Sequence, residues 1–483
     1  MQRDIQSWLS PDPRKNHDIA CELHHEGTAA WFIEGDMKAK DNDGSILLHE
    51  AAWEDHKGLA HSLIEHDTDA MAKNEDGSPP LYSAVRERSV DLTHFLVKHS
   101  VDAAAPDEDW GTPLLWAVRA RRVDLVRLLV EHGADTTAKD KHGSTPLHWS
   151  SRVGGIDIAR ILLEHAADVK AKNDDGWTPL HEAAWKDRVD LARLLVKSGA
   201  NVTANSKDGS TPLHFSVRVK SMELARFLIE HRADAAARDE DGWTPLHWAV
   251  RVRRVDLARL LVGHGADTTA KTSRGWTPLH LAVWRGREDL VRLLIEYGAD
   301  TTARYKDGST PLHLAVSAGR VDLAHLLIEW GAYAIVKDKD GPAMLREAVW
   351  AQNVDLARLL VEYGADATVS ERDQSTPLHV AARRGSVDLT RLLIEYGADA
   401  TKQDKDGVTP LHLAAAQKSG GVDLARLLVD RGVDATAQDN HGRTPLYFAL
   451  GAGRKDLAGF LIEHGAQHNH GRLRRIWQST RYE

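Results

Sequence analysis

The chain has 483 residues, a formal net charge of −9 and a charged fraction of 28%, which together describe a long and mildly acidic protein. This balance gives no reason to expect bulk attraction to nucleic acid or to an anionic membrane surface. The single cysteine, Cys21, excludes a disulfide framework within the chain and fits a reducing compartment.

No apolar run is long enough to span a membrane, and the first residues lack a charged-then-apolar signal peptide. We therefore expect a cytoplasmic protein, with nuclear entry left open. The sequence pattern predicts three segments: a leader and capping segment over residues 1–39, repeated units over residues 40–466, and a polar, basic tail over residues 467–483.

The leader carries WLSPDP from Trp8 and NHDIACELHHEGTAAWF from Asn16. It resembles the short segment that precedes the nucleotide-binding domain of fungal-type NACHT receptors, which implies kinship or fusion. An inherited NTPase is not expected, because the chain contains no GxxxxGK[ST] loop to hold phosphates. We predict that Thr28 to Glu34 forms a helix that covers the open apolar face of the first repeat.

One unit repeats along residues 40–466, and a leucine within a TPLH-like tetrad marks its register. This leucine occurs 13 times at intervals of 33 residues, except for a last interval of 35. A fixed period of this size indicates a stacked architecture, in which short helices bury their apolar faces against neighbouring copies. The marker residues are Leu48, Leu81, Leu114, Leu147, Leu180, Leu213, Leu246, Leu279, Leu312, Leu345, Leu378, Leu411 and Leu446.

Residues 241–267, DGWTPLHWAVRVRRVDLARLLVGHGAD, show what each part of the unit does. Thr244 precedes the first helix and can accept a hydrogen bond from its free N–H groups, and Pro245 suits the first helical position. Asp256 lies at the positive end of the second helix, and Gly265 suits the left-handed residue that ends it. The apolar positions at helical spacing are Leu246, Ala249 and Val250, then Leu257, Leu260, Leu261 and Val262.

The unit DGxTPLHxA…VDLxRLLxxxGAD resembles the ankyrin repeat, and the resemblance covers roughly residues 40–466. It implies an all-α solenoid, a single elongated and curved array of about 13 helix–loop–helix units with short β-hairpin loops. It also implies a concave face that binds other proteins without catalysis. We therefore expect a monomeric, non-catalytic protein-interaction scaffold.

Two places depart from the regular unit. At the ninth-to-tenth junction, the run from Gly341 to Arg346 lacks the Thr, the Pro in its usual place and the His. We expect local opening to be easiest there, unless the change is harmless drift. In the twelfth repeat, two extra residues within Ala416 to Gly421 predict a longer helix–helix loop.

Histidine is abundant, with 27 copies, so a metal site must be considered. The tetrad histidines fall one per repeat, about 10 Å apart, whereas zinc ligands must converge within about 2 Å of one ion. The ankyrin resemblance implies that they join neighbouring loops by hydrogen bonds, and a second set at helix ends suits the helix dipole. The tetrad set is His49, His148, His181, His214, His247, His280, His313, His379 and His412, and the helix-end set includes His132, His165, His231, His264 and His464.

Nothing in the sequence indicates catalysis. Cys21 lies near His24 and His25, a pairing that is more often incidental than nucleophilic. We therefore predict no catalytic residue, no metal and no cofactor. The recurrent acids Asp190, Asp256 and Asp289 are predicted to begin helices and to pair with Arg193, Arg259 and Arg292 three residues later.

One position stands out from the template, four residues after the tetrad His. The ankyrin resemblance implies that this position faces the concave groove, and in the first eight repeats it is only Arg or Trp. Together with five tryptophans that flank the tetrads, these residues form what we call the Arg/Trp stripe. Its members are Trp53, Arg86, Arg119, Arg152, Trp185, Arg218, Arg251 and Trp284, with Trp149, Trp177, Trp243, Trp248 and Trp276.

We predict that the Arg/Trp stripe binds a protein segment that carries Asp or Glu and apolar anchors, because Arg and Trp are enriched at binding hot spots. In one alternative, the Arg and Trp side chains only stack on one another and on acids such as Glu54, Glu87 and Asp187. In another, Arg and stacking aromatics bind single-stranded nucleic acid, although the charge balance argues against it. In a third, the chain is a sensor or adaptor remnant of a NACHT-type receptor without its NTPase.

Overall fold

The computed structural model describes residues 48–49, 51–53, 56–65, 73, 78–99, 111–417 and 421–466. The leader with its predicted capping helix, and the tail, lie outside the described residues. The chain divides into two compact units, which we call unit 1 (residues 1–240) and unit 2 (residues 241–483). Over the described residues, every helix is too short or too polar to cross a bilayer.

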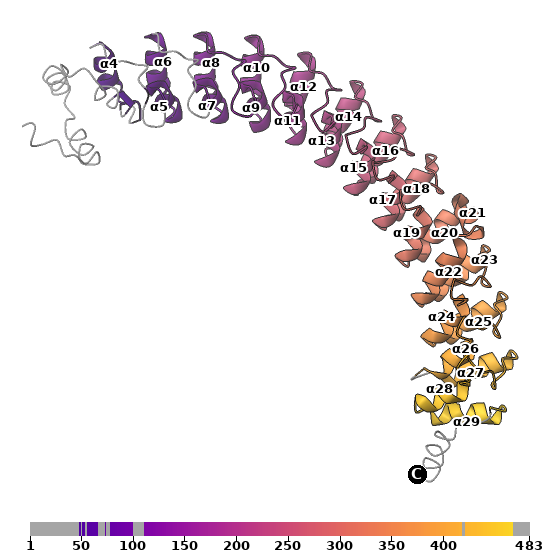
Figure 1. The fold of residues 1–483 in the computed structure, drawn as a ribbon. Coiled ribbons are helices and arrows are strands. Elements are labelled where there is room, and N and C mark those ends of the chain that lie inside the picture. The colour runs from indigo at the N-terminus through magenta and orange to yellow at the C-terminus, as the bar shows by residue number, and fades with distance from the viewer. Residues whose placement is uncertain are drawn as a thin grey trace, which may run out of the picture. The chain divides into compact units, whose positions relative to one another are not determined.

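Unit 1 alternates between a first helix and a second helix in each repeat. The first helices lie in one row and the second helices in a row beside it (Figure 1). The first helices are α5 (Pro80–Arg86), α7 (Pro113–Arg119), α9 (Pro146–Val153), α11 (Pro179–Trp185) and α13 (Pro212–Arg218). The second helices are α4 (Lys57–Glu65), α6 (Val90–Lys98), α8 (Val123–Glu131), α10 (Ile156–Glu164), α12 (Val189–Lys197) and α14 (Met222–Glu230).

Unit 2 repeats the same two-row arrangement with one irregular junction. Its first helices are α15 (Pro245–Arg251), α17 (Pro278–Trp284), α19 (Pro311–Ser317), α22 (Gly341–Trp350), α24 (Pro377–Arg384), α26 (Pro410–Ala415) and α28 (Pro445–Gly451). Its second helices are α16 (Val255–Gly263), α18 (Glu288–Glu296), α20 (Val321–Leu327), α23 (Val354–Glu362), α25 (Val387–Glu395), α27 (Gly421–Asp430) and α29 (Lys455–Glu463). Of the longer loop that is predicted between α26 and α27, residues 418–420 lie outside the described residues.

The predicted roles within the unit are confirmed. Thr244 has an extended backbone and its hydroxyl accepts the His247 N–H, while Pro245 begins α15. Leu246 and Leu257 are fully buried between the helix rows. Gly265 has a φ of 86°, and the bonds that follow it close the helix end, as in the Schellman arrangement.

The loops that join one repeat to the next, which we call fingers, are tighter than the predicted β-hairpins. No strand is present over the described residues. In the finger around Gly143, the Asp140 N–H donates to the Ser144 carbonyl at 3.0 Å and the Gly143 N–H donates to the Asp140 carbonyl at 2.9 Å. Neighbouring fingers are joined by single backbone bonds, such as Asp174 N–H to His142 carbonyl at 3.0 Å. One or two bonds per finger are too few to make a strand.

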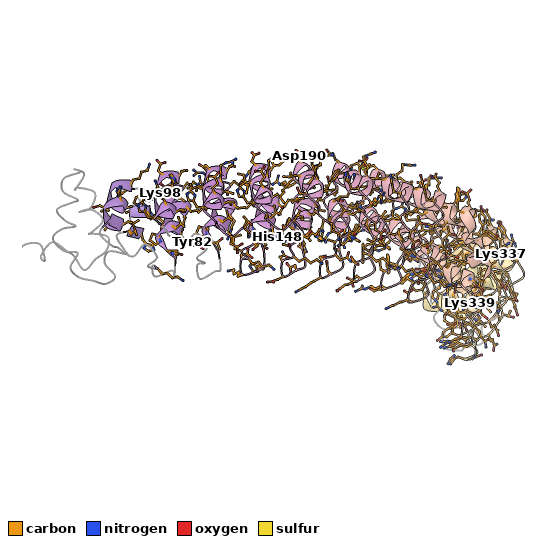
Figure 2. All side chains as sticks on the ribbon, turned by 90° about the horizontal axis from the view of Figure 1, so that it is seen from above. Tyr82, Lys98, His148, Asp190, Lys337 and Lys339 are labelled. Atoms are coloured by element: carbon orange, nitrogen blue, oxygen red, sulfur yellow. The ribbon has the colours of Figure 1, made fainter. Side chains whose placement is uncertain are left out.

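The fingers and the helix–helix loops define different edges of each unit. In Figure 2, Asp190 at the start of α12 and His148 in α9 lie toward opposite edges of unit 1. The first helices therefore run from the finger edge to the loop edge, and their last residues, the positions of the Arg/Trp stripe, lie near the loops.

The ninth-to-tenth junction of unit 2 folds as helix where other repeats have a finger. The segment η1 (Ile328–Ala332) follows α20 and contains a kink, because Trp330 and Gly331 have non-helical backbone angles, and α21 (Tyr333–Lys337) begins directly after it. Gly331 has a φ of 112°, and a Cβ on Gly341 would overlap the Val336 carbonyl oxygen. The missing tetrad thus accompanies a different, packed structure, and easy opening at this place stays a prediction.

Candidate functional site

The tetrad histidines are structural, as the sequence predicted. The Thr145 N–H donates to His148 Nδ1 at 3.2 Å, and His148 Nε2–H donates to the Trp177 carbonyl of the next finger at 2.9 Å. This pattern assigns the neutral tautomer with its proton on Nε2. Burial lowers the pKa of His148 and of His181 to about 4, which keeps both rings neutral at physiological pH.

The helix-end histidines act as C-terminal caps. In each, Nδ1–H donates to the carbonyl four residues earlier, for example His132 to Leu128 at 2.8 Å and His264 to Leu260 at 2.8 Å. These bonds add a side-chain donor to a carbonyl of the last helical turn; the Leu128 carbonyl, for example, also accepts the backbone N–H of His132. No group of three or more His, Cys, Asp or Glu residues that could hold a metal ion occurs among the described residues.

The Arg/Trp stripe begins in unit 1 with side chains that solvent can reach. Trp53 is 49% exposed and Trp185 is 36% exposed. Arg86 and Arg119 are exposed, and Arg152 is half-buried. These residues lie at or near the C-terminal ends of the first helices, so one member follows the next at a spacing of one repeat.

In the middle of unit 1 the stripe is a stacked ladder. The Arg119 guanidinium carbon lies 4.9 Å from the Trp116 ring centroid and 4.4 Å from that of Trp149. The Arg152 guanidinium carbon lies 4.8 Å from the same Trp149 ring. The Trp149 indole N–H donates to Asp140 at 2.8 Å, which fixes the ring at the base of a finger. Cation–π contacts of this kind contribute about 0.5–2 kcal/mol each.

Arg152 differs from Arg86 and Arg119 because it is already paired. Its Nε and Nη2 donate to the Glu182 carboxylate at 3.0 and 2.8 Å, and the Glu182 side chain is 1% exposed. The alternative of internal stacking and pairing is therefore correct for this residue, although its partner is Glu182 and not one of the acids first considered. No ion pair is present on Arg86 or Arg119 among the described residues.

A second aromatic group follows in unit 1. Trp177, Trp185 and Phe215 make mutual contacts, with ring centroids 6.1 Å apart for Trp177–Trp185 and 4.5 Å apart for Trp177–Phe215. The Arg218 guanidinium carbon lies 5.2 Å from the Trp185 centroid. The structure therefore brings Trp177, Trp185 and Arg218 together as the stripe predicted, and it adds Phe215.

Unit 2 contains its own part of the stripe. The Arg251 guanidinium carbon lies 5.3 Å from the Trp243 centroid and 4.7 Å from that of Trp248. Trp284 is 55% exposed and its ring lies edge-on to Trp276, with centroids 5.8 Å apart. Each predicted residue of unit 2 thus has an aromatic or cationic neighbour from the stripe.

The predicted i, i+3 ion pairs are wrong for the acids at two of the second-helix starts. Asp256 pairs with Arg254 at 2.5 Å and Asp289 pairs with Arg287 at 2.5 Å. Both arginines are N-cap residues with extended backbone, so the side chain folds back onto the acid two positions later. Arg292, expected with Asp289, pairs with Glu288. Arg193, expected with the third acid, Asp190, pairs with Glu223 of the next repeat.

Comparison with known proteins agrees with this geometry. A family model described as ankyrin repeats (3 copies) matches residues 48–140, 137–206, 200–272, 256–305, 267–338, 301–371, 345–439 and 378–472. A comparison with curated protein sequences gives no significant match. The leader lies outside the matched region, so its likeness to NACHT receptors stays a prediction. The matched region covers most of the chain and the same tetrads that cap the first helices, and the chain therefore belongs to the ankyrin-repeat family.

Proposed function

We propose that the chain is a non-catalytic interaction module that binds a protein segment along the Arg/Trp stripe. Ankyrin repeats indicate protein–protein interaction, and the stripe adds a chemistry for the partner. That partner carries Asp or Glu side chains between apolar anchors. We also propose that the chain works as a monomer in the cytoplasm or nucleus.

The observation that carries the proposal is the state of Arg119. Its guanidinium is held between the Trp116 and Trp149 rings, and it has no ion pair among the described residues. Stacking on the ring faces leaves the N–H groups at the guanidinium edge free to donate, and a carboxylate accepts two of them in parallel. Because the side chain is already ordered, binding costs less conformational entropy.

The same contacts disfavour the nucleic-acid alternative. Single-stranded nucleic acid needs open aromatic faces on which bases stack. Two guanidinium groups, from Arg119 and Arg152, already lie over the Trp149 ring. The stripe therefore offers N–H donors for a carboxylate in preference to a stacking platform for bases.

The test is charge reversal at the arginines that carry no ion pair. The double variant Arg86→Glu/Arg119→Glu should lose the proteins that wild type captures from a lysate, as quantified by mass spectrometry. A matched control reverses two exposed arginines of second helices, Arg127→Glu/Arg160→Glu, and should keep them. Arg152 is left unchanged, because its loss would leave Glu182 buried without a partner. Equal capture by both double variants would refute the stripe as the binding site.

A further inference from the structure

Glu347 in unit 2 occupies the same place in its repeat as Glu182 does in unit 1. Both follow directly the position of the tetrad His, which is His181 in one repeat and Arg346 in the other. Glu182 is paired with the arginine 30 residues before it, Arg152. The residue at that distance before Glu347 is Ser317, whose hydroxyl only donates to the Leu314 carbonyl of its own helix at 3.3 Å. The tenth repeat thus has the acid of this pair without the arginine.

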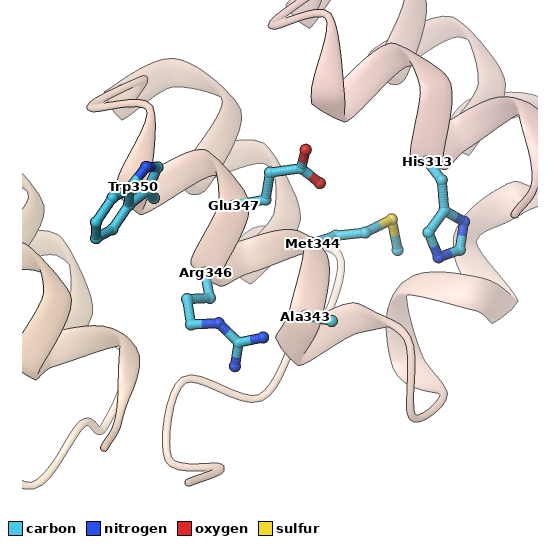
Figure 3. Close-up of a pocket in the computed structure, with 6 residues that line it drawn as sticks. All are labelled: His313, Ala343, Met344, Arg346, Glu347 and Trp350. Carbon is cyan, nitrogen blue, oxygen red and sulfur yellow. The ribbon is translucent and has the colours of Figure 1, made fainter. Parts of the chain in front are cut away.

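Glu347 lies on an open hollow of about 370 Å³ between α19 and α22. Figure 3 shows Met344 reaching toward His313, and Glu347 and Trp350 on the same helix. The lining residues are His313, Ala343, Met344, Arg346, Glu347 and Trp350. The missing tetrad of the tenth repeat creates this hollow, because Ala343 and Met344 stand where other repeats have Thr and Pro.

The charges around the hollow leave Glu347 without a partner among the described residues. Arg346 is paired with Glu371. His313 accepts the Thr310 N–H on Nδ1 at 3.2 Å, and burial lowers its pKa, so the ring is neutral. Glu347 is itself exposed; the partial desolvation that it has raises its pKa, and no cation among the described residues opposes that shift. The hollow is therefore acidic and partly apolar.

We propose that this hollow binds an arginine side chain of a protein partner, whose guanidinium takes on Glu347 the place that Arg152 has on Glu182. Arginine fits better than lysine because its planar fork can donate two parallel bonds to one carboxylate, as Arg152 does at 3.0 and 2.8 Å. The Trp350 ring, which is 54% exposed, offers the methylene stem an apolar contact on the face that the Arg384 guanidinium does not cover, and the 1% exposed Met344 forms part of the wall. This site stands independently of the Arg/Trp stripe, since none of its lining residues belongs to the stripe and it selects the opposite charge.

The methionines provide a direct reporter of occupancy. The chain has five of them, and Met344 lines the hollow while Met222 lies in α14 of unit 1. The full chain, labelled with carbon-13 at the methionine methyl groups, is titrated with the probe acetyl-Ser-Leu-Arg-Leu-Ser-amide and followed by NMR. A second titration uses the same peptide with citrulline, which keeps the shape of arginine and removes its charge.

We expect the arginine peptide to shift the Met344 signal in a saturable way, with Met222 unchanged. The Kd should be at least tenfold weaker for the citrulline peptide and for the Glu347→Gln variant. The Ser317→Arg variant should also bind the arginine peptide at least tenfold more weakly than wild type. The new arginine would pair with Glu347 inside the chain, as Arg152 pairs with Glu182. Ala416→Arg is the matched control, because Ala416 has the place in its repeat that Ser317 has in the ninth. The residue that corresponds there to Glu347 is Phe448, so the added charge meets no acid and the affinity for the peptide should not change.

Other outcomes would overturn the proposal. They are no saturable shift of Met344, equal affinity for the arginine and citrulline peptides, or unchanged affinity in Ser317→Arg. The tail contains Arg472, Arg474 and Arg475 and is the competing occupant. If deleting residues 467–483 raises the affinity of the peptide tenfold, the chain fills the site itself and the partner is not its occupant.

Discussion

Replacing His148 and His181 with glutamine is expected to reduce the acid sensitivity of unit 1 between pH 6.5 and pH 5. Both rings are buried, and in the folded chain burial lowers the pKa of each from 6.5 to about 4. In the unfolded chain both take up a proton below about pH 6.5. The stability that depends on the neutral rings is therefore complete above pH 6.5 and is lost as pH falls toward 4.

The size of the effect follows from the number of protons taken up. At pH 5.5 each of these histidines is about nine-tenths protonated when unfolded and almost unprotonated when folded. Unfolding thus takes up nearly two protons, which corresponds to a loss of about 2 kcal/mol of stability per pH unit. Carboxylates with lowered pKa, such as Asp124, add their own loss only at lower pH.

The measurement is urea unfolding of the full chain at pH 7.5, 6.5 and 5.5, with the unfolding of unit 1 followed by hydrogen exchange of its peptides. Glutamine can still complete the capping box, so we expect a cost of only about 1–2 kcal/mol per site at pH 7.5, from the lost bond to the next finger. The double variant should then have a clearly shallower pH slope than wild type, and His214, which is buried in the same kind of capping box in unit 1, stays in place in both. His142→Gln, at an exposed finger position, should keep the wild-type slope. Parallel slopes for wild type and the double variant would refute the neutral, buried state of these rings.

Three further predictions concern stability. Arg152→Met should destabilise unit 1 by about 2 kcal/mol in urea unfolding, because Glu182 stays buried without its partner, and adding Glu182→Leu should recover most of the loss. Arg121→Gly should raise the melting temperature, with a gain of about 1 kcal/mol, because Arg121 has a φ of 59° that favours glycine; an unchanged or lower melting temperature would contradict this. Gly341→Ala should destabilise unit 2 by more than about 2 kcal/mol because its Cβ meets the Val336 carbonyl, whereas Gly451→Ala, with open space around it, should be neutral or stabilising in the same thermal assay.

The sequence was sufficient to predict the helices of each repeat and the residues at their ends. Thr244, Pro245 and Gly265 were assigned to the helix ends that they occupy, because capping depends on the local chain alone. The pairing of Asp256 was wrong for a related reason: the i, i+3 rule describes residues within a helix, and its true partner, Arg254, lies at the N-cap. The helical junction at η1 and α21 could not be predicted either, since its sequence only shows that the usual tetrad is absent.

The stripe shows a different limit of prediction from sequence. Identical residues at one repeat position have different roles, because each contacts a different residue 30 positions later in the chain. Arg119 meets Trp149 and stacks, whereas Arg152 meets Glu182 and is neutralised. Trp185 meets Phe215 edge-on, with ring centroids 5.8 Å apart. The position of a residue within the repeat therefore predicts where its side chain lies. The identity of the residue 30 positions later predicts whether that side chain is free to bind a partner. This pairing could have been read from the sequence, since stacking the repeats in register places each first-helix end beside the residue after the tetrad His of the next repeat. Ser317 with Glu347 is the pair in which the acid has no cation, and for that reason it is where we expect an arginine from outside the chain.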